Sequence, residues 1–456
     1  MTTTSDAVPD ARTVAAELSD AGVAGVTISW ADNNGIPRSR TVPVSALPRV
    51  AETGIGVTTL FAVFDSSDAI TYAHEGLSSP SGDVRLVPVL DGLVPLAGQP
   101  ALAWAPGRIL DADGAPWPYD QRAVLERQVE ELGKAGLTAL VGYEIEFGVY
   151  AEGGPDEFVP AHPGPAYSPH ALLAVDEFMA DVLRDFTANG LEIGQLHAEY
   201  GPAQMELSLA PSDPVTAADR QLLARQTLRA AARRNGLRLS FAPLPAQAAA
   251  GNGWHIHSSV WRDGRNLLAG NQEGPGAEGA AYIAGLLRDL PAVAAITAPT
   301  LGSLARLRPG FFAGAFAFWG VENREAPLRY VPGSKFLGSD HANVELKTSD
   351  ASANPYLALA AVLAAGAAGV ADELSLEPPV QADPGSWSEK ERAEQKIALL
   401  PRTQAEQEAA LTGNPRIPAV LGDDLLGAFL AVRRSDAAAA EDRSPDDVLA
   451  GLRWRY

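Results

Sequence analysis

Acidic side chains alternate with apolar ones in a short segment, residues 142–147 (Gly-Tyr-Glu-Ile-Glu-Phe). In a β-strand, residues two apart point to the same face, so Glu144 and Glu146 are expected to project together. Two neighbouring carboxylates repel each other unless a cation neutralises them. The pair therefore indicates either a cation site or a solvated strand face with salt-bridge partners, and the segment alone does not decide between the two.

Three further segments carry similar patterns. Glu199 and Glu206 flank a Gly-Pro turn, whose reversal could bring the two acids face to face. His255 and His257 alternate along another apolar stretch, and Glu345 lies in a fourth. A lone buried histidine is usually a hydrogen-bonded core residue, but two histidines on one strand face also suit a binding site.

Together these segments place five carboxylates and two histidines on or beside four predicted strands. Ligation rich in oxygen, with one imidazole, suits Mg²⁺ or Mn²⁺ better than zinc. Two such ions would suit phosphoryl transfer, in which metal clamps a polyphosphate. The sequence has no cysteine, which excludes a thiolate zinc site and a cysteine nucleophile, and it has no P-loop motif.

Residues 304–329 are rich in arginine although the chain is acidic. Arginine is suited to bidentate contact with carboxylates and phosphates. Aromatic residues in the same segment favour a partly buried location, whereas the alternative is a set of surface ion pairs. The arginines are Arg306, Arg308, Arg324 and Arg329.

The overall composition is that of a globular protein. Of 456 residues, 46% are hydrophobic and 20% are charged, and the net charge is −21. This acidic balance argues against a nucleic-acid partner. The N-terminus lacks a basic start and an apolar run, and no stretch approaches the about 18 apolar residues of a membrane helix. We therefore expect a cytoplasmic protein with no membrane partner.

The elements that must position these residues fall into two regions. The first is predicted to be a small sheet with a helix: a helix over 11–21 and strands over 25–30, 38–44, 58–64 and 84–89, with a turn at 32–35. Pro/Gly-rich stretches at 105–107 and 113–118 are predicted to form a connection. This places the domain boundary so that 15–112 and 113–456 form separate domains.

The second region alternates helices and strands. The periodicity predicts strands over 139–150, 204–210, 255–261 and 343–347, and helices over 119–135, 169–189, 217–235, 279–296 and 355–371. The Ala-rich run at 357–370 is predicted to be a buried helix, and the short run at 437–440 a surface helix.

Six segments in this order resemble glutamine synthetase, and the resemblance covers residues 20–456. They are Glu144-Ile145-Glu146-Phe147, Glu199 to Glu206, Asn252 to His257, Arg306 to Gly310, Asn323-Arg324 with Arg329, and Glu345 to Tyr356. The resemblance implies an α+β fold, with a small N-terminal β-grasp domain and a large catalytic domain on a curved antiparallel sheet. It also implies a homo-oligomer, a double-ring dodecamer with active sites between neighbouring subunits.

The resemblance also assigns roles by position. One Mg²⁺ (or Mn²⁺) would be held by Glu146, Glu199 and Glu206, and the other by Glu144, His255 and Glu345. Contacts to ATP would come from His257, Ser259, Arg329 and Arg324. Glutamate would be bound by Asn252, Gly253, Arg306 and Lys347. The catalytic groups would be Arg324, Arg306 and Asp65, the last as the acid of the amine site.

The implied chemistry begins with ATP, which phosphorylates the γ-carboxylate of glutamate. A neutral amine then attacks the acyl phosphate while the protein excludes water. Four departures from the family pattern bear on the amine and on regulation. Phe312 replaces the flap acid, the segment at Asp65 lacks its glycine, Lys347 replaces an arginine, and Ala398 replaces the tyrosine that is modified by adenylylation.

We therefore predict an ATP-dependent glutamate–amine ligase whose acceptor is an organic amine, of the ethanolamine or polyamine type. One alternative is a glutamine synthetase that uses ammonia. Another is a catalytically silent relative, kept as a metal-stabilised scaffold, although a scaffold has no need of two paired cation sites.

Overall fold

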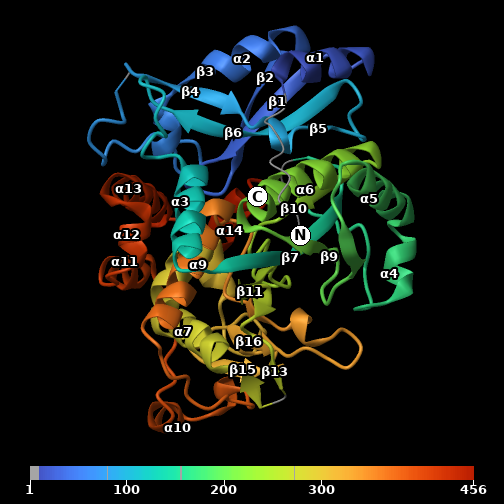
Figure 1. The fold of residues 1–456 in the computed structure, drawn as a ribbon. Coiled ribbons are helices and arrows are strands. Elements are labelled where there is room, and N and C mark those ends of the chain that lie inside the picture. The colour runs from blue at the N-terminus through green and yellow to red at the C-terminus, as the bar shows by residue number, and fades with distance from the viewer. Residues whose placement is uncertain (1–9, 80, 155–156, 272) are drawn as a thin grey trace.

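The chain is built around two β-sheets. The structure, a computed structural model, describes residues 10–79, 81–154, 157–271 and 273–456. In Figure 1 the first sheet (blue) lies at the top, and the second (green to orange) lies below it. The first has the strand order β2-β1-β6-β4-β3, with β5 on β6. The second has the order β15-β16-β17-β11-β7-β9-β8, with β10 on β7 and β12 on β11.

The first sheet contains the predicted hairpin. Its elements are α1 (Ala11–Asp20), β1 (Gly25–Ala31), β2 (Pro37–Pro43), α2 (Leu47–Thr53), β3 (Ile55–Thr58), β4 (Asp83–Pro88), β5 (Val94–Pro95) and β6 (Leu102–Leu110). β1 and β2 pair antiparallel around the predicted turn, and β1 and β6 pair parallel in the middle of the sheet. Strands β1 and β6 both contribute residues to one hydrophobic cluster of this region.

Two predictions for this region are wrong. Residues 105–107 belong to the central strand β6 and not to a connection. Pro106 is tolerated because it is the last residue paired with β1, so its missing N–H falls at the end of that ladder. A strand was expected over 58–64. The strand found here, β3, ends at Thr58, and a 3₁₀ turn follows over Thr59–Val63.

The second sheet is centred on the long strand β7. Its members are β7 (Thr138–Ala151), β8 (Ile193–Ala198), β9 (Gln204–Ser212), β10 (Leu237–Ser240), β11 (Trp254–Arg262), β12 (Arg265–Asn266), β15 (Trp319–Val321), β16 (Leu328–Val331) and β17 (Asn343–Leu346). β13 (Gly270–Asn271) and β14 (Gly274–Pro275) form a separate hairpin. Strand β7 lies between β9 and β11, and both of these strands run antiparallel to it.

Helices cover the second sheet and fill the space beside it (Figure 1). They are α3 (Gln121–Lys134), α4 (Pro169–Leu173), α5 (Asp176–Ala188), α6 (Pro214–Arg234), α7 (Ala277–Thr297), α8 (Leu301–Arg306), α9 (Pro355–Ala371), α10 (Glu389–Glu394), α11 (Gln404–Thr412), α12 (Ile417–Leu421), α13 (Asp423–Ala440) and α14 (Pro445–Leu452). The single helix expected over 169–189 is two helices, because the buried Val175 between them is not helical (φ −134°). The end of α13 is the predicted surface helix at 437–440.

The apolar helices form the core of the second region. α9 is buried along most of its length, as its sequence predicts. Among the described residues α7 is long and apolar enough to cross a membrane by length and composition, so the expectation that no segment reaches this length is wrong. However, 78% of its most apolar window is buried inside the fold. It packs against α9 as a core helix does.

A polar junction joins the two regions. Asn354, the N-cap of α9, donates hydrogen bonds from its side chain to the carbonyl oxygens of Ala31 (3.2 Å) and Asp32 (3.0 Å). Ala428 of α13 packs into the hydrophobic cluster of the first sheet. The motif at 354–356 therefore acts structurally, because it begins the buried helix and holds the first hairpin.

Two glycines let α7 and α9 approach closely. A Cβ atom on Gly369 would lie 2.1 Å from the carbonyl oxygen of Ala281, and one on Gly285 would lie 2.3 Å from that of Ala365. These distances leave no room for a side chain at the crossing, so the backbones themselves are in contact.

We predict that Gly369→Val lowers the free energy of unfolding by about 2–3 kcal/mol, because the helices must separate to admit the side chain. Thermal or denaturant unfolding measures the change. Gly133→Ala in α3 is the matched control, since no atom lies within 4 Å of its Cβ position. It should stabilise the chain by up to about 1 kcal/mol. Equal effects of the two substitutions would contradict the close-crossing explanation.

Candidate active site

The register of the second sheet brings the predicted acids and histidines together. Across β7 and β11, Glu144 lies opposite His255. Across β11 and β17, His257 lies opposite Glu345. Directly opposed residues of antiparallel strands share one face of the sheet. These four side chains therefore converge, as their alternation in the sequence predicts.

Short contacts connect this first group. Nδ1 of His255 lies 3.0 Å from Glu144 Oε2 and 3.4 Å from Glu345 Oε1, and Nε2 of His257 lies 3.4 Å from Glu144 Oε1. Ligand atoms of Glu144, His257 and Glu345 all lie within 4.8 Å of one another, so these residues form a cluster that could hold a metal ion. The resemblance assigned His255 to this ion and His257 to the nucleotide, whereas the geometry brings both histidines to the same carboxylate.

A second group lies on the other side of β7. Glu146 is opposite Glu206 of β9. Glu146 Oε2 accepts hydrogen bonds from the backbone N–H of Gly253 (2.6 Å) and from Gln204 Nε2 (3.2 Å). Nε2 of His255 lies 3.6 Å from Glu146 Oε1. His255 therefore stands between the two groups of acids, in contact with both.

Glu199 and Glu206 do not lie opposite each other in the register. On the β8 side, the residue opposite Glu206 is His197, whose Nε2 lies 3.4 Å from Glu206 Oε1. Glu199 follows β8 and interacts with the hydroxyl of Tyr167. Burial, together with the charges of Glu146 and Glu206, nevertheless raises the pKa of Glu199, so the three acids influence one another. Sequence reasoning missed His197, although it stands two residues before Glu199 at strand spacing.

The charges of the first group balance one another. Burial acts to raise the pKa of Glu144, but hydrogen bonds with His255 and His257 hold it far below its usual value. Burial acts to lower the pKa of His257, but Glu144 and Glu345 raise it to about 9. Lys347 and the two histidines lower the pKa of the buried Glu345 to about 2. Protonated side chains thus serve as counter-cations for these carboxylates.

Basic and amide side chains surround the acids. Arg329 Nη1 lies 2.9 Å from Glu345 Oε2, and Lys347 Nζ lies 3.3 Å from its Oε1. The buried Arg306 donates to the backbone carbonyl of Lys347 at 3.1 Å. The buried Asn252 lies beside the second group, because its Oδ1 accepts a hydrogen bond from Gln204. Ser259 follows the histidines on β11 and accepts a hydrogen bond from Trp261.

Two predicted residues lie outside the cluster within the described part of the chain. Arg324 is exposed, on the turn between β15 and β16. Asp65 is buried in the first region, where its carboxylate accepts hydrogen bonds from Ser67 and Ala69 and from the hydroxyl of Ser435 on α13. Within a single chain, neither Arg324 nor Asp65 therefore lies beside the clustered glutamates.

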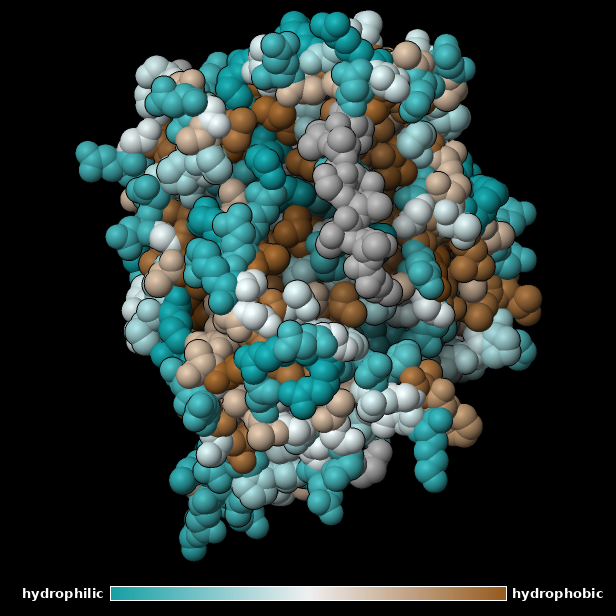
Figure 2. All heavy atoms as spheres, in the orientation of Figure 1, coloured by the Kyte–Doolittle hydropathy of each residue, from teal (hydrophilic) through white to brown (hydrophobic). Residues whose placement is uncertain are grey.

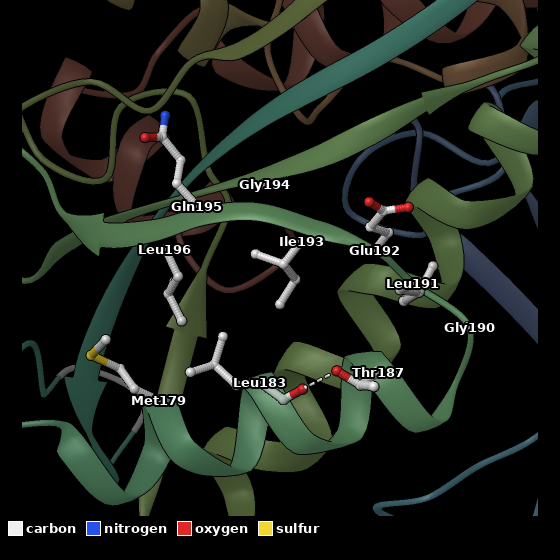
Figure 3. A pocket seen from close by; sticks show the side chains of 10 residues that line it. All are labelled: Met179, Leu183, Thr187, Gly190, Leu191, Glu192, Ile193, Gly194, Gln195 and Leu196. Atoms are coloured by element: carbon white, nitrogen blue, oxygen red, sulfur yellow. Dashed lines mark hydrogen bonds between the residues drawn. The ribbon is translucent and has the colours of Figure 1, made fainter.

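A hollow of about 510 Å³ lies elsewhere, between α5 and β8 (Figure 3). Its lining is mostly apolar and contains none of the predicted site residues. Hydrophobic residues gather at the right edge of the molecule in Figure 2, over the area of α4 and α5. Leu173 (70% exposed) and Leu183 (46% exposed) belong to these helices. The acid cluster, and not this hollow, is the candidate active site.

The metal-free chain should be most stable between about pH 4.5 and 6.5. His257 holds its proton more tightly in the folded state (pKa about 9, ordinarily 6.5), so its stabilisation is complete below pH 6.5 and is lost as the pH rises through 9. Glu345 (pKa about 2, ordinarily 4.5) stabilises above pH 4.5, and this is lost as the pH falls toward 2. Denaturant unfolding in chelator measures both limbs. His257→Gln should flatten the alkaline limb and also reduce the acid limb, because His257 helps to lower the pKa of Glu345. An unchanged alkaline limb would contradict the assignment.

Glu144→Gln should weaken Mn²⁺ binding at least about tenfold, because it removes one charged oxygen ligand while nearly keeping the shape. Titration calorimetry with Mn²⁺ measures the change, and thermal unfolding verifies the fold. Glu131→Gln is the control, since this acid is exposed on α3 and pairs with Lys134. Similar Mn²⁺ affinities for the two variants would contradict a cation site at Glu144.

Comparison with known proteins adds independent support. The family model described as "Glutamine synthetase, catalytic domain" matches residues 118–448. A gamma-glutamylpolyamine synthetase, GlnA3 of Streptomyces coelicolor, is 41% identical over 98% of this chain and 97% of its own length. A glutamine synthetase of Pyrococcus horikoshii is 32% identical over 84% of this chain and 82% of its own length.

Solved structures agree with the sequence matches. A "novel glutamine synthase homolog" superposes with a TM-score of 0.83 at 33% identity, covering 94% of this chain and 98% of that one. An ADP complex of GmaS has a TM-score of 0.81 at 24% identity, covering 95% and 97%, and shows the same fold. The mixed α+β architecture and the resemblance to glutamine synthetase are thereby confirmed, and the chain belongs to the glutamine synthetase family of carbon–nitrogen ligases.

Proposed function

We propose that the chain is an ATP-dependent ligase that joins the γ-carboxylate of glutamate to an organic amine of the ethanolamine or polyamine type. The reaction passes through a γ-glutamyl phosphate and releases ADP and phosphate. The observation that carries the proposal is the 41% identity to a gamma-glutamylpolyamine synthetase along nearly the whole of both chains. Seven glutamine synthetases that also match this chain are 29–34% identical to it.

The donor set fits two divalent cations, Mg²⁺ or Mn²⁺. We assign one to Glu146, Glu199 and Glu206, and the other to Glu144, His255 and Glu345. Carboxylate oxygens with one imidazole are the ligands that these ions accept. Bound there, the cations would neutralise the polyphosphate of ATP.

The surrounding residues orient these ligands and the substrates. Arg329 and Lys347 fix the carboxylate of Glu345 from two sides, and His257 fixes that of Glu144. We assign Arg329, Arg324, His257 and Ser259 to contacts with ATP. Asn252, Gly253, Lys347 and Arg306 are assigned to glutamate, and Arg324 is assigned to the transferred phosphate.

The finer architecture is part of the same proposal. We propose that 15–112 is a β-grasp domain and 113–456 the catalytic domain. This is supported by two hydrophobic clusters, one drawn mostly from the first region and the other mostly from the second. We also propose a cytoplasmic double-ring dodecamer. The exposed position of Arg324, away from the acids of its own chain, suits a site that a neighbouring subunit completes.

Ammonium should be a poorer acceptor than an organic amine. The loop that follows Arg306 presents the exposed ring of Phe312 where the family has an acid. An apolar ring can pack on the carbon chain of a larger amine, and each buried methylene contributes about 0.8 kcal/mol, or roughly fourfold in kcat/KM. Putrescine or spermidine should therefore exceed ammonium at least about tenfold.

The test compares kcat/KM for ammonium, ethanolamine, putrescine and spermidine, from ADP release at saturating glutamate and ATP. Glu144→Gln in parallel shows whether turnover arises from this site. Ammonium as the best acceptor would replace the proposal with a true glutamine synthetase. ADP release with none of the acceptors, alongside intact Mn²⁺ binding, would identify a silent scaffold.

A further inference from the structure

The loop over residues 308–314 stands in an unfavourable conformation. Phe312 has a φ of 53°, a left-handed conformation that costs an L-residue with a bulky side chain free energy. Phe311 and Phe312 are 56% and 63% exposed, so burial of their rings does not hold the loop. Some other contact must keep the backbone in this shape.

Glu325 supplies that contact from beneath the loop. Its side chain is buried, with 5% of the residue exposed, and its Oε2 accepts a hydrogen bond from the backbone N–H of Phe312 at 3.0 Å. The backbone of Gly310 also acts to lower the pKa of this carboxyl group. The second oxygen, Oε1, is buried without a hydrogen-bond partner among the described residues. An unpaired buried carboxylate oxygen is costly and is therefore suited to receive a donor from a ligand.

The loop and Glu325 lie at the end of β17 that carries the site. The hydroxyl of Thr348 donates to the carbonyl of Gly314 at 2.9 Å, and the backbone N–H of Lys347 donates to Pro327 at 2.9 Å. Lys347 in turn contacts Glu345 of the acid cluster. Two residues after Glu325, the backbone is thus hydrogen-bonded to Lys347, whose side chain contacts a proposed metal ligand.

The charges around Glu325 favour a cation. Burial raises the pKa of Glu325, the exposed Asp383 raises it further, and Lys347 acts to lower it. Lys347 is already paired with Glu345. Among the charges that shift the pKa of Glu325, one further carboxylate, that of Asp383, thus stands against a single ammonium that is already paired.

We infer that Glu325 is the specificity-determining acid for the amine substrate, and that its free oxygen receives the substrate's ammonium group. The inference rests on the proposed function, because it names the residue that recognises the amine. Phe312 occupies the loop position at which relatives carry an acid, so Glu325 supplies the carboxylate from below. The exposed rings of Phe311 and Phe312 then provide an apolar wall for the carbon chain. Asp65 is less suited, since its carboxylate already accepts hydrogen bonds from Ser67, Ala69 and Ser435.

The decisive variant is Glu325→Gln. Its amide oxygen can still accept the N–H of Phe312, so the loop keeps its support while the charge is lost. The acceptors are spermidine and putrescine, which are cationic near neutral pH, and hydroxylamine, which is mostly uncharged there. We expect KM for spermidine to rise at least tenfold, while KM for glutamate and kcat/KM for hydroxylamine stay within about twofold of the wild type.

Two further variants complete the design. Glu322→Gln removes an exposed acid three residues earlier and should leave every constant unchanged. Glu325→Asp retains the charge, so it should preserve the preference for spermidine over hydroxylamine, and it serves as the reporter should Glu325→Gln unfold early in thermal melts. Loss of that preference in Glu325→Asp, with the fold intact, would count against the inference.

The outcomes separate the inference from the proposed function. A wild-type enzyme that prefers ammonium overturns the proposed function whatever the variants do. With a wild type that prefers organic amines, equal losses for spermidine and hydroxylamine in Glu325→Gln would show that the residue only supports the loop. Unchanged constants in Glu325→Gln would overturn the inference as well.

Discussion

The hydrogen-bond ladder on both sides of β7 is the constraint on which the site depends. Antiparallel register places Glu144 against His255 on one side and Glu146 against Glu206 on the other. A shift by one residue would send each of these side chains to the opposite face. The backbone therefore fixes the positions of charges that repel one another, and the histidines, Lys347 and Arg329 make that arrangement tolerable in the absence of metal.

This arrangement explains why so much polar chemistry can lie within an apolar sheet. Glu345 is fully buried, yet Arg329, Lys347 and His255 all contact its carboxylate. A buried charge that has lost one partner is costly, because the remaining partners cannot replace its hydration. The ligands are thus held in place before any cation or nucleotide arrives, and little reorganisation is needed on binding.

Local patterns in the sequence predicted the faces of the strands well, because alternation is a property of neighbouring residues. Glu144, Glu146, His255 and His257 were found in this way. Long-range register was not accessible, so Glu199 was expected opposite Glu206, where His197 stands. Pro106 was taken as a sign of a connection, because its place at the end of a ladder depends on strands far away in sequence.

Glu325 illustrates a second limit of sequence reasoning. It follows Asn323-Arg324 and precedes the apolar Ala326-Pro327, so in the sequence it resembles an ordinary acid of a surface turn. Its burial and its hydrogen bond to Phe312 arise only when two loops of the fold meet. A carboxyl group in apolar surroundings was the signal that could have identified it.

The junction between the first sheet and α13 has a consequence for how the chain folds. Asp65 accepts a hydrogen bond from Ser435, and Ala428 belongs to the hydrophobic cluster that β1 and β6 cover. These contacts join residues more than three hundred positions apart. During synthesis, the first sheet emerges long before α13. The apolar surface that Ala428 covers therefore stays exposed until that helix is made. The N-terminal region is therefore made first, but its contacts with α13 can form only after that helix has left the ribosome.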